Sequence, residues 1–368
     1  MMKKLLFTAV LVALLFFPGL GAADTWNLVT SGGLGDSSNE DAWAMVLFNG
    51  MLYVGTTNES TGAEVWSYDG STWTQVNTDG FGDSNNTGIS EMKTSNGKLY
   101  AATANSTTGT EVWEYDGKNW SQVNADGFGD KNNWRTDSMI ISNDGLFAGA
   151  ENYSGAEIWL YDGVNWSQLN ADGFGDVNRF APTDMAFFNG SLHVAVASFT
   201  EGAQVWRYDG RAWDQVNTNS FGDANNFSAT SLAVFNNLLY VSTWNSTTGI
   251  ELWEYNGSSW KQINKDGFGT ANNDLSWFMT AYNDNLYVGT RNSADGAEIW
   301  RYDGMDWSSS VAGGFGSTGN SRISSMAVFD GRLLASTLNT AGTEIWALRK
   351  PLRVTPTASF LLLLFSGN

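Results

Sequence analysis

The sequence predicts an all-β protein, a seven-bladed β-propeller with four antiparallel strands in each blade. The first observation is a motif of Glu or Gln, an aliphatic residue and Trp that returns every 46 or 47 residues. Its tryptophans are Trp66, Trp113, Trp159, Trp206, Trp253, Trp300 and Trp346. The second observation is that each repeat contains strand-like runs separated by turn residues. A repeat of this length is typical of propellers and solenoids, and closing the sheets into a ring removes the exposed edges of an open stack.

The second repeat shows how each element is assigned. Its four predicted strands lie around Met92–Thr94 and over Leu99–Thr103, Glu111–Tyr115 and Asn119–Val123. Asn-Gly and Asp-Gly pairs supply the first and last turns between them. In all repeats but one, the first strand carries a methionine, a flexible apolar residue that suits a core seam. The second strand continues with small residues, which we expect to let neighbouring sheets approach closely.

The two ends of the repeat array predict how the ring closes. Residues 26–29, Trp-Asn-Leu-Val, form a fourth strand with no first three strands before it. The last repeat contains the first three strands, ending at Trp346, and lacks a fourth. We therefore expect the N-terminal strand to complete the last blade.

The repeat resembles the Kelch-type propellers. The resembling residues are a Glu-Val-Trp-x-Tyr-Asp-Gly run, the tryptophan that follows it, and a later Asn-Gly-x-Leu-Tyr-Val-Gly run. In Kelch repeats, a tyrosine in the third strand and a tryptophan in the fourth flank the turn. The likeness spans about residues 25–348, but pairs such as Gly55-Thr56 and Ala102-Thr103 replace the glycine pair after the second strand. The resemblance implies a ring of four-stranded blades.

Residues 1–23 are typical of a Sec-type signal peptide. Two lysines precede an apolar run from Leu5 to Phe17, and small residues form a cleavage site before Asp24. The apolar run is too short for a stable membrane span, so the leader predicts export. We therefore expect a secreted or cell-surface protein whose propeller occupies residues 24–348, with no stable transmembrane span in the mature chain.

Residues 349–368 form a tail that resembles the start of a PEP-CTERM sorting signal. A short Val-Thr-Pro-Thr motif leads into an apolar run from Phe360 to Phe365. The glutamate between prolines and the basic cluster of that signal are missing. These six apolar residues are far fewer than the roughly 20 of a membrane span. The tail is interpreted either as a degenerate sorting signal or as a frayed or truncated end.

Composition excludes several classes of function. The chain carries a formal net charge of −19 and contains no cysteine. A strongly acidic surface repels nucleic acid and anionic membranes, so neither is an expected partner. Without cysteine there are no disulfides and no thiolate metal sites. A single histidine gives no support to His-based catalytic or zinc sites.

Repeated polar residues lie in loops that we expect on one face of the ring. In an antiparallel meander, the loop between the second and third strands shares this face with the segment that links two blades; we name it the loop face. The linking segments, of the type Asp-Gly-Phe-Gly-Asp-x-Asn-Asn, contain Asp83, Asp130, Asp176 and Asp223. Because Asp and Asn readily bond local amides, we interpret these residues as turn-forming. Oxygen-rich loops also suit calcium, so these four aspartates are the candidate metal ligands, and no other cofactor is expected.

The positions at which the repeats disagree predict the ligand site. Fourteen of the 18 tryptophans belong to the two repeated positions, and the other four lie in loop-face segments. These four are Trp43, Trp134, Trp244 and Trp277, and near them lie Arg135, Asp137, Arg179 and Asp184. Because the scaffold does not require this variation, we expect these eight residues to bind a ligand. Aromatic rings stack while polar groups fix orientation, so the expected ligand is an extracellular carbohydrate or another protein.

Two alternatives remain open from the sequence. A glycoside hydrolase or lyase needs a pair of carboxyl groups near the central channel, and Asp137 with Asp184 or Glu91 offers one. A purely structural surface protein has a featureless loop face on which these residues have drifted. The sequence assigns no catalytic residue.

Overall fold

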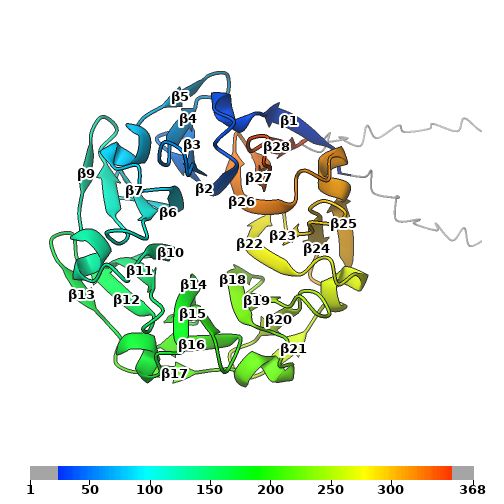
Figure 1. Cartoon of the computed structure of the whole chain (residues 1–368). Coiled ribbons are helices and arrows are strands. Elements are labelled where there is room, and N and C mark those ends of the chain that lie inside the picture. Colours follow the sequence, from blue (N-terminus) through cyan, green and yellow to red (C-terminus); the bar gives the residue numbers. More distant parts are fainter. Residues whose placement is uncertain (1–23, 350–368) are drawn as a thin grey trace, which may run out of the picture.

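The computed structural model describes residues 24–349, which form a ring of four-stranded antiparallel blades around a central opening (Figure 1). We number the blades 1 to 7 by the chain order of their innermost strands. The innermost strands are β2 (Asp41–Phe48), β6 (Gly88–Ser95), β10 (Arg135–Ser142), β14 (Arg179–Phe188), β18 (Ser228–Phe235), β22 (Leu275–Tyr282) and β26 (Arg322–Phe329). The second strands are β3 (Met51–Thr57), β7 (Lys98–Ala104), β11 (Gly145–Glu151), β15 (Ser191–Ser198), β19 (Leu238–Trp244), β23 (Asn285–Arg291) and β27 (Arg332–Leu338).

The outer half of each blade consists of two shorter strands. The third strands are β4 (Val65–Tyr68), β8 (Val112–Tyr115), β12 (Glu157–Tyr161), β16 (Gln204–Tyr208), β20 (Leu252–Tyr255), β24 (Ile299–Tyr302) and β28 (Ile345–Leu348). The fourth strands are β5 (Trp73–Gln75), β9 (Trp120–Gln122), β13 (Trp166–Gln168), β17 (Trp213–Gln215), β21 (Trp260–Gln262), β25 (Trp307–Val311) and, for blade 7, β1 (Trp26–Thr30). Short 3-10 turns precede the innermost strands: η1 (Gly33–Gly35), η2 (Asp79–Gly82), η3 (Asp126–Gly129), η4 (Asp172–Gly175), η5 (Asn219–Gly222), η6 (Asp266–Gly269) and η7 (Gly313–Gly316). The predicted all-β propeller is confirmed, and the 28 strands of residues 24–349 fit the predicted seven blades of four.

The ring closes through its two ends. Strand β1 pairs antiparallel with β28, and Trp26 lies opposite Leu348. The backbone N–H of Arg349 also donates to the carbonyl oxygen of Thr25 at 2.7 Å. Figure 1 shows β1 beside β28. The N-terminal strand therefore completes blade 7, as predicted from the count of strands.

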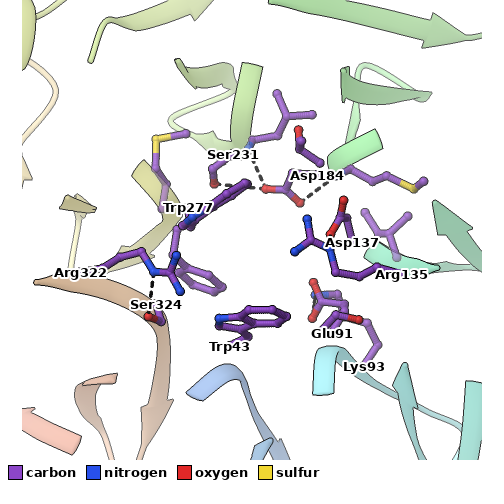
Figure 2. A pocket seen from close by; sticks show the side chains of 17 residues that line it. Trp43, Glu91, Lys93, Arg135, Asp137, Asp184, Ser231, Trp277, Arg322 and Ser324 are labelled. Atoms are coloured by element: carbon purple, nitrogen blue, oxygen red, sulfur yellow. Dashed lines mark hydrogen bonds and ion pairs between the residues drawn. The ribbon is translucent and has the colours of Figure 1, made fainter. Parts of the chain in front are cut away.

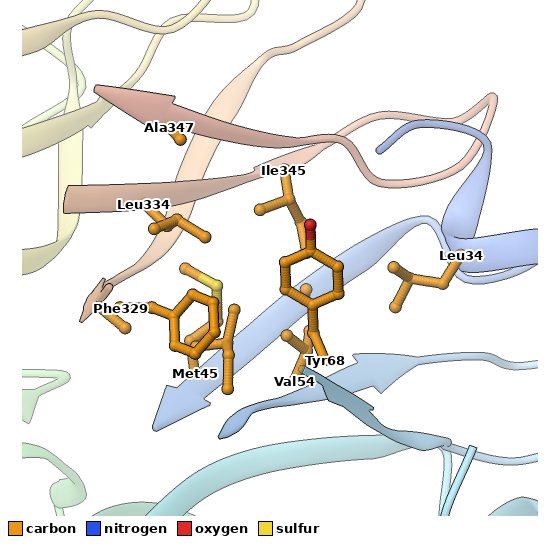
Figure 3. Packing of buried hydrophobic residues seen from close by; sticks show 11 residues of the cluster. Leu34, Met45, Val54, Tyr68, Phe329, Leu334, Ile345 and Ala347 are labelled. Carbon is orange, nitrogen blue, oxygen red and sulfur yellow. The ribbon is translucent and has the colours of Figure 1, made fainter. Parts of the chain in front are cut away.

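The hydrophobic core lies between neighbouring blades. At the seam of blades 1 and 7, Met45 of blade 1 packs with Leu334 and Ile345 of blade 7 (Figure 3). Small residues in the second strands make this spacing possible: a Cβ atom added to Gly55 would lie 2.5 Å from the Cβ atom of Ile89 in the next blade. The expected role of these small residues is thus seen in the packing.

Each linking segment forms a left-handed turn, and in six of the seven, all but η1 with its Leu34, aromatic stacking holds this turn. In η2, Gly80 has a φ angle of 55° and Phe81 one of 58°. A phenylalanine in this conformation is strained, and the surrounding structure must hold it there. Phe81 stacks on Trp113, with ring centroids 4.6 Å apart and planes 7° apart. Equivalent stacks involve Phe128, Phe174, Phe221, Phe268 and Phe315.

The two predicted terminal segments lie outside the described residues. These are the signal peptide, residues 1–23, and residues 350–368 of the tail. Within residues 24–349, no helix has the length and hydrophobicity needed to cross a membrane.

Candidate functional site

A β-bulge in every innermost strand re-aims one side chain. In β6 the pairing register shifts between Ile89 and Glu91, which leaves Ser90 without a partner residue on β7. The residues at this bulge position are Trp43, Ser90, Asp137, Thr183, Thr230, Trp277 and Ser324. All of them except Thr230 line one central cavity. Bulges commonly re-aim side chains beside functional sites, and here they turn the residues toward the channel.

The central cavity has one aromatic and one charged side. Its volume is about 340 Å³, which falls in the range of roughly 300–1,000 Å³ for small-molecule sites. Trp43 from β2 and Trp277 and Phe278 from β22 form the aromatic side, beside which Arg322 from β26 also lines the cavity. The charged side consists of Glu91 and Lys93 from β6, Arg135 and Asp137 from β10, and Asp184 from β14. Figure 2 shows Trp43 and Trp277 facing the charged groups across the cavity.

Arg135 connects the cavity with the loop face. Its Nη2 donates to Glu151 Oε2 at 2.7 Å, and its Nε forms an ion pair with Asp137 Oδ1. Its guanidinium also lies over two indole rings, 4.6 Å from the centroid of Trp134 and 5.4 Å from that of Trp43. These contacts on several sides hold the guanidinium in one orientation.

Asp137 presents a carboxylate oxygen that the described part of the chain leaves unsatisfied. Its side chain is 8% exposed, and its Oδ2 has no hydrogen-bond partner within residues 24–349. Burial raises the pKa of Asp137 well above its usual value; Arg135 opposes this shift, and the neighbouring Glu151 adds to it. A carboxyl oxygen that has no partner within the protein can accept a hydrogen bond from a ligand. Asp137 is therefore suited to bonding a ligand hydroxyl.

Both carboxylate oxygens of Asp184 accept hydrogen bonds within the protein. Its Oδ2 accepts from the backbone N–H of Leu232 at 2.7 Å and from Ser231 Oγ at 3.1 Å. Its Oδ1 accepts from the backbone N–H of Met185 at 2.7 Å. Burial raises the pKa of Asp184 to about 6. This residue ties blade 4 to blade 5 while it forms part of the cavity wall.

An ion pair at the closing seam holds the aromatic side in place. Trp43 Nε1 donates to Asp41 Oδ2 at 2.7 Å, and Arg322 of blade 7 forms an ion pair with the same carboxylate. On the charged side, Lys93 pairs with Glu91 at 3.0 Å. The cavity walls are therefore positioned by contacts within the protein, as in a preformed binding site.

Five of the eight predicted ligand residues line this cavity, namely Trp43, Arg135, Asp137, Asp184 and Trp277. The other three, Trp134, Arg179 and Trp244, lie elsewhere at the loop-face edge. The ring of Trp134 packs against the guanidinium of Arg135. Trp244 contacts Phe227 edge-on, with ring centroids 4.9 Å apart. The eight residues thus do not converge on one concavity.

Arg179 belongs to a network that is specific to blade 4. Its Nη2 pairs with Glu201 Oε2 at 2.7 Å, and its guanidinium lies 4.9 Å from the ring centroid of Trp206. Gln204, which replaces the glutamate of the other blades, accepts from Trp206 Nε1 at 2.8 Å and donates to Glu201 at 2.7 Å. Arg179 is therefore engaged within its own blade.

Sequence reasoning missed several cavity residues. These are Ser90, Lys93, Ile140, Thr183, Ser231 and Ser324. A signal for three of them, Ser90, Thr183 and Ser324, was present, because aligning the repeats on the recurring methionine places all bulge residues in one column. In that column, serine and threonine are less conspicuous than tryptophan and aspartate.

The four candidate metal aspartates contact the turns in which they lie. Asp83 Oδ1 accepts from the backbone N–H of Asn85 at 2.9 Å, and its Oδ2 accepts from Asn105 Nδ2 at 3.3 Å. The other three aspartates make the same kind of local contact. Over residues 24–349, no group of three or more His, Cys, Asp or Glu side chains is placed to hold a metal ion. These contacts support the turn-forming interpretation.

Solved structures with a similar fold include two extracellular domains of hybrid two-component systems from B. thetaiotaomicron, BT4673 and BT3049. The TM-scores are 0.62 and 0.58, the identities 16% and 12%, and the matches cover 88% and 84% of this chain. They cover only 39% and 40% of those longer chains. YCF48 from Cyanidioschyzon merolae matches with a TM-score of 0.55 and 11% identity, over 89% of this chain and 99% of its own. Neither a protein-family model nor a curated protein matches the sequence.

Proposed function

We propose that this propeller is an extracellular binding protein whose central cavity holds a carbohydrate. The observation that carries the proposal is the two-sided cavity, with Trp43 and Trp277 facing Arg135 and Asp137. The C–H face of a sugar ring stacks on indole, while its hydroxyl groups exchange hydrogen bonds with polar side chains. A sugar hydroxyl would satisfy Asp137 Oδ2, whose unmade hydrogen bond is otherwise costly.

The extracellular location has two supports. The leader in residues 1–23 has the pattern of a secretory signal. Two of the structures with a similar fold are extracellular domains. The Kelch type of the repeat and the sorting role of the tail rest on sequence resemblance and are part of the same proposal.

The test is glycan-array binding by the purified protein, followed by titration of the best ligand against variants. Trp43→Ala and Trp277→Ala each remove a stacking surface, and we expect each to weaken affinity about tenfold. Asp137→Ala removes a buried hydrogen bond and should weaken affinity by about the same factor. Met305→Ser is the control, because this side chain is 85% exposed in the turn between β24 and β25, away from the loop face. Binding that persists without both Trp43 and Trp277 would reject the cavity as the site.

Glycoside hydrolysis is the second candidate function. Burial raises the pKa of both Asp137 and Asp184, which line the same cavity, and a raised pKa is typical of a carboxyl group that acts as a general acid. Incubation of the bound oligosaccharide with the protein, followed by mass spectrometry, distinguishes hydrolysis from binding. Cleavage by the native protein that is absent in Asp137→Asn would support hydrolysis. Recovery of an intact oligosaccharide would support binding without hydrolysis.

A further inference from the structure

Six aromatic side chains form a continuous arc on the loop face of blades 3, 4 and 5. The members of this aromatic arc are Trp134, Tyr153, Phe180, Phe199, Phe227 and Trp244. Successive ring centroids lie 4.0 to 6.3 Å apart. Tyr153 is 61% exposed and Phe199 is 53% exposed, whereas Phe180 beneath them is buried. Two exposed aromatic side chains above a cluster of further rings form an apolar patch of the kind that marks interaction sites.

The repeat itself shows that the scaffold does not require these rings. The position of Trp134, Phe180 and Phe227 is occupied in the other blades by Glu40, Thr87, Asp274 and Ser321. The position of Tyr153 and Phe199 is occupied in the other blades by Glu59, Ser106, Ser246, Ser293 and Thr340. In the other blades, the same loop backbone therefore forms with polar side chains at these positions. The aromatic side chains are confined to one sector, which points to an interaction made by that sector.

The shape of the arc suits protein side chains better than a flat sugar chain. Tyr153 is tilted by 45° against Phe180 and by 42° against Phe199, so the rings share no common plane. One face of Phe199 is covered by Phe180, whose ring is parallel within 12°. The guanidinium of Arg135 covers one face of Trp134. Sugar stacking needs flat and accessible ring faces, whereas a ridged apolar surface interdigitates with aliphatic or aromatic side chains.

The charges around the aromatic arc indicate which class of protein segment is complementary to it. The linking segments of these three blades carry Asp126, Asp130, Asp172, Asp176 and Asp223. The cations near the rings are Lys131, Arg135, Arg179 and Arg291. Each of the three arginines forms an ion pair within the protein: Arg135 with Glu151, Arg179 with Glu201 and Arg291 with Asp274. An apolar centre within an acidic border is complementary to a basic, apolar segment. A second copy of this chain, with a net charge of −19, is a poor match for the same border.

We propose that the aromatic arc is a docking surface for a cationic segment of another protein. Apolar side chains of that segment pack between Tyr153 and Phe199, and its Lys and Arg side chains face the aspartates of the linking segments. Aromatic residues and Arg are typical of the energetically dominant centres of protein interfaces. This surface is distinct from the cavity, because within residues 24–349 none of its six rings is among the residues that line the cavity.

A random short-peptide phage library selected on the purified protein tests the proposal. We expect enrichment of peptides that combine net positive charge with aliphatic or aromatic residues, and weaker binding as ionic strength rises. The variant combines Tyr153→Ser with Phe199→Ser, the residue that the repeat uses in three other blades. The matched control combines Val164→Ser with Met305→Ser, two side chains 79% and 85% exposed in turns between third and fourth strands. The enriched peptide should bind the arc variant at least tenfold more weakly and the control unchanged.

The remaining outcomes separate this surface from the cavity. Trp43→Ala with Trp277→Ala should keep peptide binding, whatever becomes of glycan binding. No enrichment, enrichment of acidic peptides, or equal binding by the arc variant would overturn the proposal. Loss of glycan binding in the arc variant would assign the rings to a carbohydrate instead. A native dimer that the arc variant dissociates, as seen by analytical ultracentrifugation, would assign them to a second copy.

Discussion

We expect Asp184 to make the free energy of unfolding fall as the pH rises. Burial raises its pKa from 3.8 to about 6 in the folded protein. The folded state therefore binds this proton more readily than the unfolded chain does, so protonated Asp184 favours folding at low pH. That contribution is lost as the pH rises through about 6. Asp184→Asn does not titrate, and we expect its free energy of unfolding to lack this fall between pH 3.8 and about 6. Urea unfolding at several pH values measures the difference, and parallel profiles for the two proteins would contradict it.

Comparison of the repeats separates scaffold from site at single residues without showing where each side chain points. Variation between repeats singles out Trp43 and Trp134 equally, yet only Trp43 lines the cavity. In a regular strand, Trp43 and Met45 share one face and pack between blades. The bulge in β2 turns Trp43 into the channel instead. The contact between Arg135 and Glu151 was also beyond sequence reasoning, because it joins two different strands.

The packing of each second strand against the next blade makes stability sensitive to size. Gly55→Ala places a Cβ atom 2.5 Å from that of Ile89, and we expect it to cost about 1–3 kcal/mol of unfolding free energy. Combining it with Ile89→Ala should cost less than the sum of the two single changes, because the smaller side chain leaves room for the added methyl group. Blade 4 already has an alanine, Ala195, in the core that also contains Ala229 of blade 5. Denaturant unfolding of the three variants measures the coupling, and strictly additive costs would argue against direct contact.

The predictability of an element depended on its hydrophobic pattern. The predicted third strand Glu111–Tyr115 agrees closely with β8, whose residues are apolar on the buried side. The innermost strand β6 is longer than the run predicted around Met92–Thr94. Its first half contains Ser90 and Glu91, which line the cavity and give no alternation of polar and apolar residues. The strand ends that form the site are therefore the parts that are least predictable from the hydrophobic pattern.

The ring as a whole was predictable because its signal is repeated. Each copy of the tryptophan motif is ambiguous alone, but a period maintained along the chain indicates stacked equivalent units. Departures from this symmetry were much harder to foresee. Tyr153 and Phe199 occupy ordinary loop positions in the sequence, and the packing of blade 3 beside blade 4 brings their ring centroids within 6.1 Å although the residues are 46 positions apart. The circular architecture therefore creates neighbours that are more than 40 residues apart in the chain.

Closure by β1 leads to a prediction about the entire ring. Deleting residues 24–30 removes the partner of β28 and exposes an edge strand. It also removes the partly buried Trp26, which packs against the core of blades 6 and 7. Together with the lost strand pairing, we expect this to cost at least about 3 kcal/mol of unfolding free energy. A circular permutant that joins Arg349 to Asp24 by a short turn, with new ends at Gly70 and Ser71 between β4 and β5, keeps every strand pair. Its thermal midpoint should stay close to that of linear residues 24–349, whereas the deletion should lower it strongly. A deletion variant as stable as the linear chain would show that β1 contributes little to holding the ring closed.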